Sequence, residues 1–129
     1  MVAKISPYSY PILNYEMLDI EKYPYVTPYV SLDIDNIHNV IREEFKVNAD
    51  YYTTKSRKRE YVEARKVLSV ILLNEQRWTL ERIGEYTGGR DHTTIINARN
   101  TMYDYYDTDH EFRLKVTIVY RRLKKHFKK

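Results

Sequence analysis

The chain has 129 residues, enough for one domain with one hydrophobic core, and its 22 lysines and arginines against 18 aspartates and glutamates give a formal net charge of +4. It contains no cysteine, which excludes a disulfide framework, thiolate chemistry and a cysteine-ligated zinc site. No run of about 18 apolar residues is present and the first residues lack the charged and then apolar layout of a signal peptide, so we expect a soluble cytoplasmic protein that does not contact a membrane.

The first 31 residues differ in composition from the rest of the chain. They contain all four prolines, six of the fourteen tyrosines, and two basic against three acidic residues, whereas residues 32–129 carry 20 basic against 15 acidic residues. Proline next to tyrosine favours extended backbone over helix, so we expect an N-terminal arm over residues 1–31 and one basic domain over residues 32–129. The tyrosines could pack the arm onto the domain, bind a protein partner or stack on bases, and packing is the commonest use of such side chains.

The rest of the chain has the apolar spacing of helices and no proline. The first helix is expected over residues 34–45, opened by Ser31 or Asp33, because its apolar side chains recur at spacings of 3, 4 and 4. A turn and a basic run at residues 55–59 follow, and the next helix is expected over residues 60–74. The apolar positions of these two helices are Ile34, Ile37, Ile41, Phe45, Tyr61, Ala64, Leu68, Ile71 and Leu72.

The three glycines of the chain lie around a turn between two further helices. We expect Thr79 to cap a short helix that ends at Gly88 and Gly89, since a glycine pair permits the positive φ of a sharp turn. A longer helix is expected from about Asp91 to Tyr105. A short helix, a turn and a longer helix form a helix-turn-helix unit. The fold class is therefore all-α, a bundle of about five to six helices containing a helix-turn-helix.

The heptad at residues 88–94, Gly-Gly-Arg-Asp-His-Thr-Thr, places side chains able to contact DNA at the start of this longer helix. Asp91 can cap the helix or accept from the amine of a cytosine, and one carboxylate could do both. His92 can donate to a base or press its ring on a thymine methyl. Thr93 offers a methyl group to thymine, and Thr94 is better suited to a phosphate.

Basic residues earlier in the chain suit the DNA backbone. Arg57 is the candidate for a minor groove, because the negative potential of a narrow A·T-rich groove attracts a guanidinium. Lys58 and Arg59 belong to the same run, which in isolation would be typical of a solvated loop. Arg65 and Lys66 lie in the first turns of the following helix, where they suit phosphates.

Together these features resemble the C-terminal DNA-binding domain of DnaA, the bacterial replication initiator. The resemblance covers roughly residues 32–123 and rests on the basic segment, the helix entry Ala64-Arg65-Lys66, Ile83-Gly84 and the heptad. It implies an all-α domain that binds short duplex sites called DnaA boxes. It implies that the residues Asp91, His92 and Thr93 enter the major groove, that Arg57 enters the adjacent minor groove, and that Arg65, Arg90 and Thr94 hold phosphates or flanking bases.

The sequence departs from that family in three respects. No G-x-x-x-x-G-K-[ST] loop is present, so the nucleotide-binding module of a full initiator is absent and no ATPase activity or cofactor is expected. Glu60 and Glu63 follow the basic run, where they would reduce phosphate affinity. Residues 1–31 lie outside the resemblance. We therefore expect a free-standing DNA-binding domain for DnaA-box-like sites at a replication origin or promoter, and a phage or mobile-element origin would suit it.

Other functions have weaker support in the sequence. Residues 107–111, Asp-Thr-Asp-His-Glu, have metal-ligating side chains, but the same types are typical of a helix start, here at Thr108 or Asp109. No serine–histidine or cysteine–histidine nucleophile is recognisable, so we expect no enzyme and no metal. The alternatives are an adaptor whose arm binds a protein partner, and a protein that binds single-stranded nucleic acid through stacked tyrosines.

Overall fold

The computed structural model describes residues 33–124, and this part of the chain consists of helices joined by loops, with no strand. Its elements in chain order are α1 (Ile34–Phe45), α2 (Arg59–Val70), the π-helical segment η2 (Ile71–Glu75), α3 (Leu80–Tyr86), α4 (His92–Thr108) and α5 (His110–Lys124). The predicted all-α class is confirmed. The predicted arm at residues 1–31 lies outside the described residues, so the division into arm and domain stays a prediction.

Helix α1 begins and ends through local backbone chemistry. Of the two predicted starts, Ser31 lies outside the described residues and Asp33 is the cap, its carboxylate accepting the backbone N–H of Asp35 at 3.3 Å. Lys46 ends the helix in the left-handed conformation, with φ at 59°, and donates its N–H to the Arg42 carbonyl. Between these ends the apolar side of the helix is buried.

The predicted helix over residues 60–74 is present but changes its geometry towards its end. The α-helix ends at Val70, and residues 71–75 form a π-helical turn whose wider spacing is visible in the bond from the Gln76 N–H to the Ile71 carbonyl at 3.1 Å. The wider turn buries Glu75 together with Ile71. The apolar spacing of the sequence does not distinguish the two geometries.

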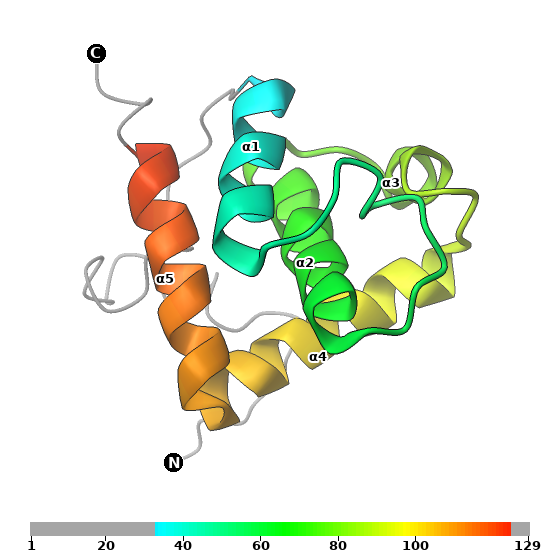
Figure 1. The fold of residues 1–129 in the computed structure, drawn as a ribbon. Helices are drawn as coiled ribbons and strands as arrows, with labels where there is room; N and C mark the ends of the chain where they lie inside the picture. The colour runs from blue at the N-terminus through cyan, green and yellow to red at the C-terminus, as the bar shows by residue number, and fades with distance from the viewer. Residues whose placement is uncertain (1–32, 125–129) are drawn as a thin grey trace.

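Helix α2 lies at the centre of the fold and packs against α1 and α4, and α5 returns alongside α1 (Figure 1). The core between these helices is aliphatic and aromatic, and Phe45 of α1 lies 6.2 Å, ring to ring, from Phe112 of α5. At the surface Arg122 of α5 forms an ion pair with Glu43 of α1. No helix among residues 33–124 is long and apolar enough to cross a membrane.

The glycines build the turn between α3 and α4 as predicted. Thr79 caps α3 by accepting the Arg82 N–H at 3.1 Å. Gly88 and Gly89 have φ of +99° and +80°, and the Gly84 carbonyl accepts the N–H groups of Gly89 and Arg90 at 2.9 and 2.8 Å. A Cβ on Gly84 would lie 2.0 Å from the Arg90 carbonyl oxygen, so only glycine fits there.

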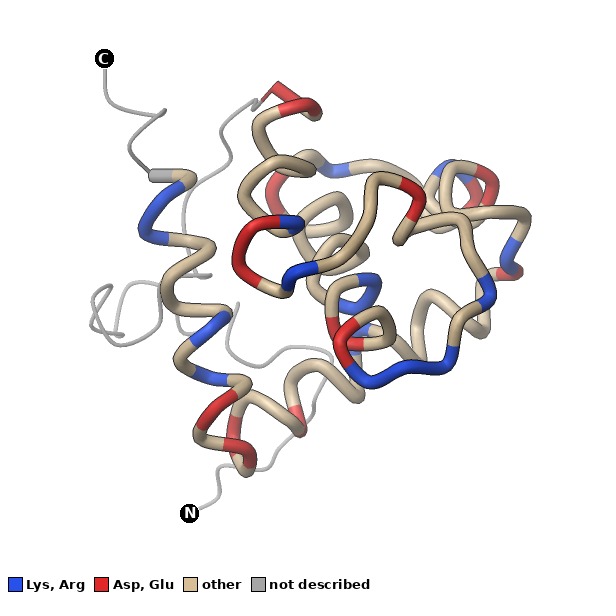
Figure 2. The backbone as a smooth tube through the Cα atoms, viewed as in Figure 1, with Lys and Arg blue, Asp and Glu red and all other residues tan. Residues whose placement is uncertain are grey.

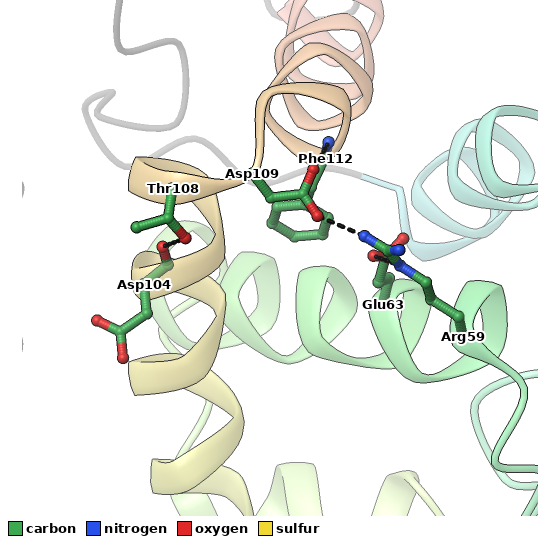
Figure 3. Close-up of polar contacts among 6 residues, drawn as sticks. All are labelled: Arg59, Glu63, Asp104, Thr108, Asp109 and Phe112. Carbon is green, nitrogen blue, oxygen red and sulfur yellow. Dashed lines mark hydrogen bonds and ion pairs between the residues drawn. The ribbon is translucent and has the colours of Figure 1, made fainter.

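The acidic run at residues 107–111 contains the end of α4 and the start of α5, which confirms its interpretation as a helix start. Helix α4 continues to Thr108, three residues further than predicted, and the Thr108 hydroxyl donates to the Asp104 carbonyl at 2.8 Å within it (Figure 3). The carboxylate of Asp109 accepts the Phe112 N–H at 3.1 Å. Asp109, rather than Thr108, therefore caps α5.

Candidate nucleic-acid interface

Helix α4 begins with a capped and otherwise solvent-facing turn. The Oδ1 atom of Asp91 accepts the backbone N–H of Thr94 at 2.9 Å and its hydroxyl at 3.0 Å. These two hydrogen bonds hold the pKa of the Asp91 carboxyl below its usual value. His92 and Thr93 on the same turn are exposed. The capping role of Asp91 is confirmed, and its contact with a base stays a prediction.

The guanidinium of Arg90 binds backbone groups of the protein itself. It donates to the backbone carbonyls of Tyr52 at 3.1 Å and Thr54 at 3.0 Å, and also to that of Thr87. Burial lowers the pKa of this half-buried guanidinium. Arg90 therefore connects the helix-turn-helix turn to the loop that precedes the basic run.

Arg65 holds the same loop from the other side. It donates to the carbonyl of Tyr51 at 3.4 Å and to that of Ser56 at 2.6 Å. Thr53 lies between these two attachment points and close to the glycine turn. A Cβ added to Gly88 would lie 3.1 Å from the carbonyl oxygen of Thr53. The segment 51–56 is thus fixed between α2 and the turn, and Arg57 follows it directly.

A polar hollow of about 270 Å³ lies between α2 and α4 beside these arginines. Burial and the charge of Arg90 lower the pKa of Arg65, and burial and the charge of Arg65 lower the pKa of Lys66. Cations that crowd one another in this way favour an anion between them. The lining residues are Val62, Arg65, Lys66, Ser69, Thr87, Arg90, Thr94, Ile95, Asn97, Ala98 and Thr101.

The sequence interpretation missed several of these lining residues. Asn97 and Thr101 follow Thr94 at helical spacing, and Ser69 follows Arg65 by one turn, so all three lie on the faces that already carried predicted contacts. That spacing was a usable signal. The hollow itself depends on how α2 and α4 pack, which local spacing does not specify.

The basic run lies along the loop that enters α2, where Ser56 separates Lys55 from the three consecutive basic residues 57–59 (Figure 2). Arg57 and Lys58 are exposed there. Arg59 differs, because its guanidinium binds Glu63 at 2.8 Å and also pairs with Asp109 at the start of α5 (Figure 3). The hydrogen bond to Glu63, followed by the two carboxylate charges, raises the pKa of Arg59. A phosphate would have to compete with these carboxylates for Arg59.

Comparison with known proteins decides the family. Residues 34–102 match the family model described as the bacterial dnaA protein helix-turn-helix. The chain belongs to this family. The matched range contains α3, the glycine turn and the larger part of α4. It also contains all ten residues predicted to contact DNA, namely Arg57, Lys58, Arg59, Arg65, Lys66, Arg90, Asp91, His92, Thr93 and Thr94.

Similar curated proteins are chromosomal replication initiators. The DnaA protein of Bacteroides thetaiotaomicron is 33% identical over 95 residues, which cover 74% of this chain and 20% of that protein. The DnaA protein of Flavobacterium psychrophilum is 29% identical over 92 residues, 71% of this chain and 19% of that protein. The chain thus spans about a fifth of the length of these dnaA relatives. Its membership identifies α3, the glycine turn and α4 as the helix-turn-helix of the bacterial dnaA family.

Proposed function

We propose that this dnaA-family domain binds duplex DNA sequence-specifically, at sites like the DnaA box. The observation that carries the proposal is the first turn of α4, where exposed His92 and Thr93 stand beside a carboxylate already oriented by the cap. Exposed side chains on the first turn of the second helix are the ones that meet base edges in a helix-turn-helix.

Base recognition is proposed for three side chains of this turn. The Asp91 bonds to Thr94 both fall on Oδ1, so Oδ2 can accept from a cytosine amine while the cap persists. The His92 ring can donate to a base acceptor, and the Thr93 methyl can contact a thymine methyl. The three together read adjacent positions in one major groove.

Backbone and minor-groove contacts are proposed for the basic side. The loop fixed by Arg65 and Arg90 presents Arg57 at its end, and such a guanidinium suits a narrow minor groove. Lys66 and Thr94 line the hollow between α2 and α4, where a phosphate would relieve the repulsion among its cations. Lys58 adds a second exposed charge.

The proposed role of this domain is DNA binding. These 129 residues contain no Walker-type loop, and the 95 of them that align with the DnaA protein of Bacteroides thetaiotaomicron cover 20% of that protein. Occupying or marking an origin, or blocking a promoter nearby, requires only binding. We propose no catalytic step for this domain.

Titration of a labelled duplex tests the proposal. A duplex with a DnaA box and a scrambled duplex of equal composition are compared over a series of salt concentrations. The box should bind at least about tenfold more tightly, and both affinities should fall as salt rises, since phosphate contacts release counterions. Equal affinities across the salt series would contradict sequence-specific binding.

A further inference from the structure

An aromatic cluster on the side of the domain formed by α1 and α3 has no part in the proposed DNA contacts. His38 bonds to the hydroxyl of Tyr51 through Nδ1 at 2.8 Å and to that of Tyr86 through Nε2 at 2.7 Å. The ring of Tyr52 lies 4.5 Å from that of His38 and stacks on Tyr86 at 4.9 Å. Burial lowers the pKa of His38, which favours the neutral ring in this setting.

Beside this cluster lies an open groove of about 440 Å³, lined by Ile34, Trp78, Arg82, Glu85 and Tyr86. Trp78 meets Tyr86 edge to face at 5.1 Å, and the Arg82 guanidinium lies 3.7 Å from the centre of the Trp78 ring. None of the five belongs to the residues proposed to contact DNA. The groove is therefore a second surface, independent of the proposed function.

The walls of the groove suit an extended chain that contains proline. Aromatic-lined grooves bind proline-rich segments, because such segments are already extended and lose little entropy on docking. A tyrosine in such a segment can pack its ring against Trp78 while its hydroxyl stays exposed to water.

We propose that residues 23–29 of the same chain, Tyr-Pro-Tyr-Val-Thr-Pro-Tyr, occupy this groove. Chain continuity supports this occupant, because Ile34 is both a wall of the groove and the first residue of α1. Pro28 precedes Ile34 by six residues, a length of chain that spans at most about 20 Å, so the proposed segment is tethered close to the groove. A tether this short also gives a high effective concentration, and weak contacts then suffice.

A competing apolar surface lies on α5. Leu114 and Ile118 are 51% and 41% exposed, and their spacing places them on one face of the helix. This pair is aliphatic and offers no aromatic wall to a proline. If the segment covered this pair in place of the groove, the quenching of Trp78 in the experiment below would be the same in all three proteins.

Trp78 is the only tryptophan of the chain, so its fluorescence reports on the groove directly. Acrylamide quenching, with excitation selective for tryptophan, is measured on the full chain and on two variants. The test variant is Tyr23→Ser, Pro24→Ser, Tyr25→Ser, Pro28→Ser and Tyr29→Ser. The matched control removes the same residue types from the same arm, with Pro7→Ser, Tyr8→Ser, Tyr10→Ser, Pro11→Ser and Tyr15→Ser.

The quenching constant of Trp78 should rise about twofold in the test variant, because one ring face loses its cover, and should stay at the wild-type value in the control. A peptide of residues 21–31 added to the test variant should lower the quenching constant of Trp78 again. Equal constants in all three proteins would overturn the proposal and leave the α5 surface or no docking at all. An equal rise in both variants, or a wild-type constant that depends on protein concentration, would also overturn it.

The duplex titration is repeated on the same three proteins to separate this inference from the proposed function. Box affinity should be similar in all of them, since the groove lies apart from the first turn of α4. A Trp78 response without any preference for the box would support arm docking while contradicting the proposed function.

Discussion

At the scale of single residues, the arginines of this domain have different roles despite equal charge. Arg57 faces solvent, Arg59 is bound by carboxylates, and Arg90 binds backbone carbonyls. A planar guanidinium with five donors suits the last role, which a lysine would not fill. Charge alone therefore does not identify the DNA contacts.

Removing the His92 side chain tests base recognition. His92→Ala should weaken box binding by about 1–3 kcal/mol, because a base-edge contact is lost, and should leave binding to scrambled duplex unchanged. The two titrations measure both quantities. Equal loss on the two duplexes would count against base contact by His92.

Arg90→Ala separates a positioning role from a phosphate contact. The substitution should lower the free energy of unfolding by about 1–3 kcal/mol, since carbonyls in the segment 52–54 lose their donor. Urea denaturation measures this change. A phosphate ligand would instead leave stability unchanged and reduce the salt dependence of DNA binding, and that result would contradict the positioning role.

The cap of α4 should depend on pH in a defined direction. The folded-state pKa of Asp91 is lowered, so the cap stabilises the helix above the unfolded value of about 3.9 and loses this effect as the pH falls through the folded value. NMR titration of the Asp91 carboxyl should give a pKa below that reference. Thr94→Val removes the hydroxyl donor and retains the N–H, so it should raise the pKa part of the way. An Asp91 pKa at the reference value in the unmodified chain would disagree with the cap geometry.

At the scale of elements, the glycine turn sets the geometry of the helix-turn-helix. Gly84→Ala should destabilise the domain by about 1–3 kcal/mol, because its Cβ meets the Arg90 carbonyl oxygen. Gly89→Ala is the matched control, since it places the same methyl group where nothing lies within 4 Å and strains only the positive φ. Thermal unfolding of both variants compares the two costs. A smaller loss for Gly84→Ala than for Gly89→Ala would contradict the close approach.

Element boundaries were predictable wherever a local signal marked them. Thr79 and Asp91 cap their helices as expected, because a cap is a bond between neighbours in sequence. The π-helical turn at 71–75 and the extension of α4 to residue 108 have no such local marker. Both features depend on how the helices pack, so the apolar spacing of the sequence did not determine them.

At the scale of the whole molecule, the surrounding charges give two adjacent residues of the basic run, Lys58 and Arg59, different expected contributions to DNA binding. Lys58→Ala should reduce the slope of log affinity against log salt by about 0.9, the value for one lost phosphate contact. Arg59→Ala should reduce it less, because Glu63 and Asp109 already bind that guanidinium. Salt titrations of both variants on one duplex measure the slopes. A larger effect of Arg59→Ala would show that DNA displaces the carboxylates.

The all-α class, the helix-turn-helix and the residues proposed to meet the bases follow from local signals, namely apolar spacing, caps and the glycine pair. The distant partners of Arg59, Arg65 and Arg90 follow only from the tertiary structure, whereas the Arg59–Glu63 pair is a local contact across one helical turn. Arg59 and Asp109 are 50 positions apart, and Arg90 and Thr54 are 36. Pairs so distant meet because α2, the turn and the α4–α5 junction pack together, and no pattern of neighbouring residues encodes that meeting. The groove at Trp78 combines a local stretch, residues 78–86, with Ile34, which only the packed core brings beside it.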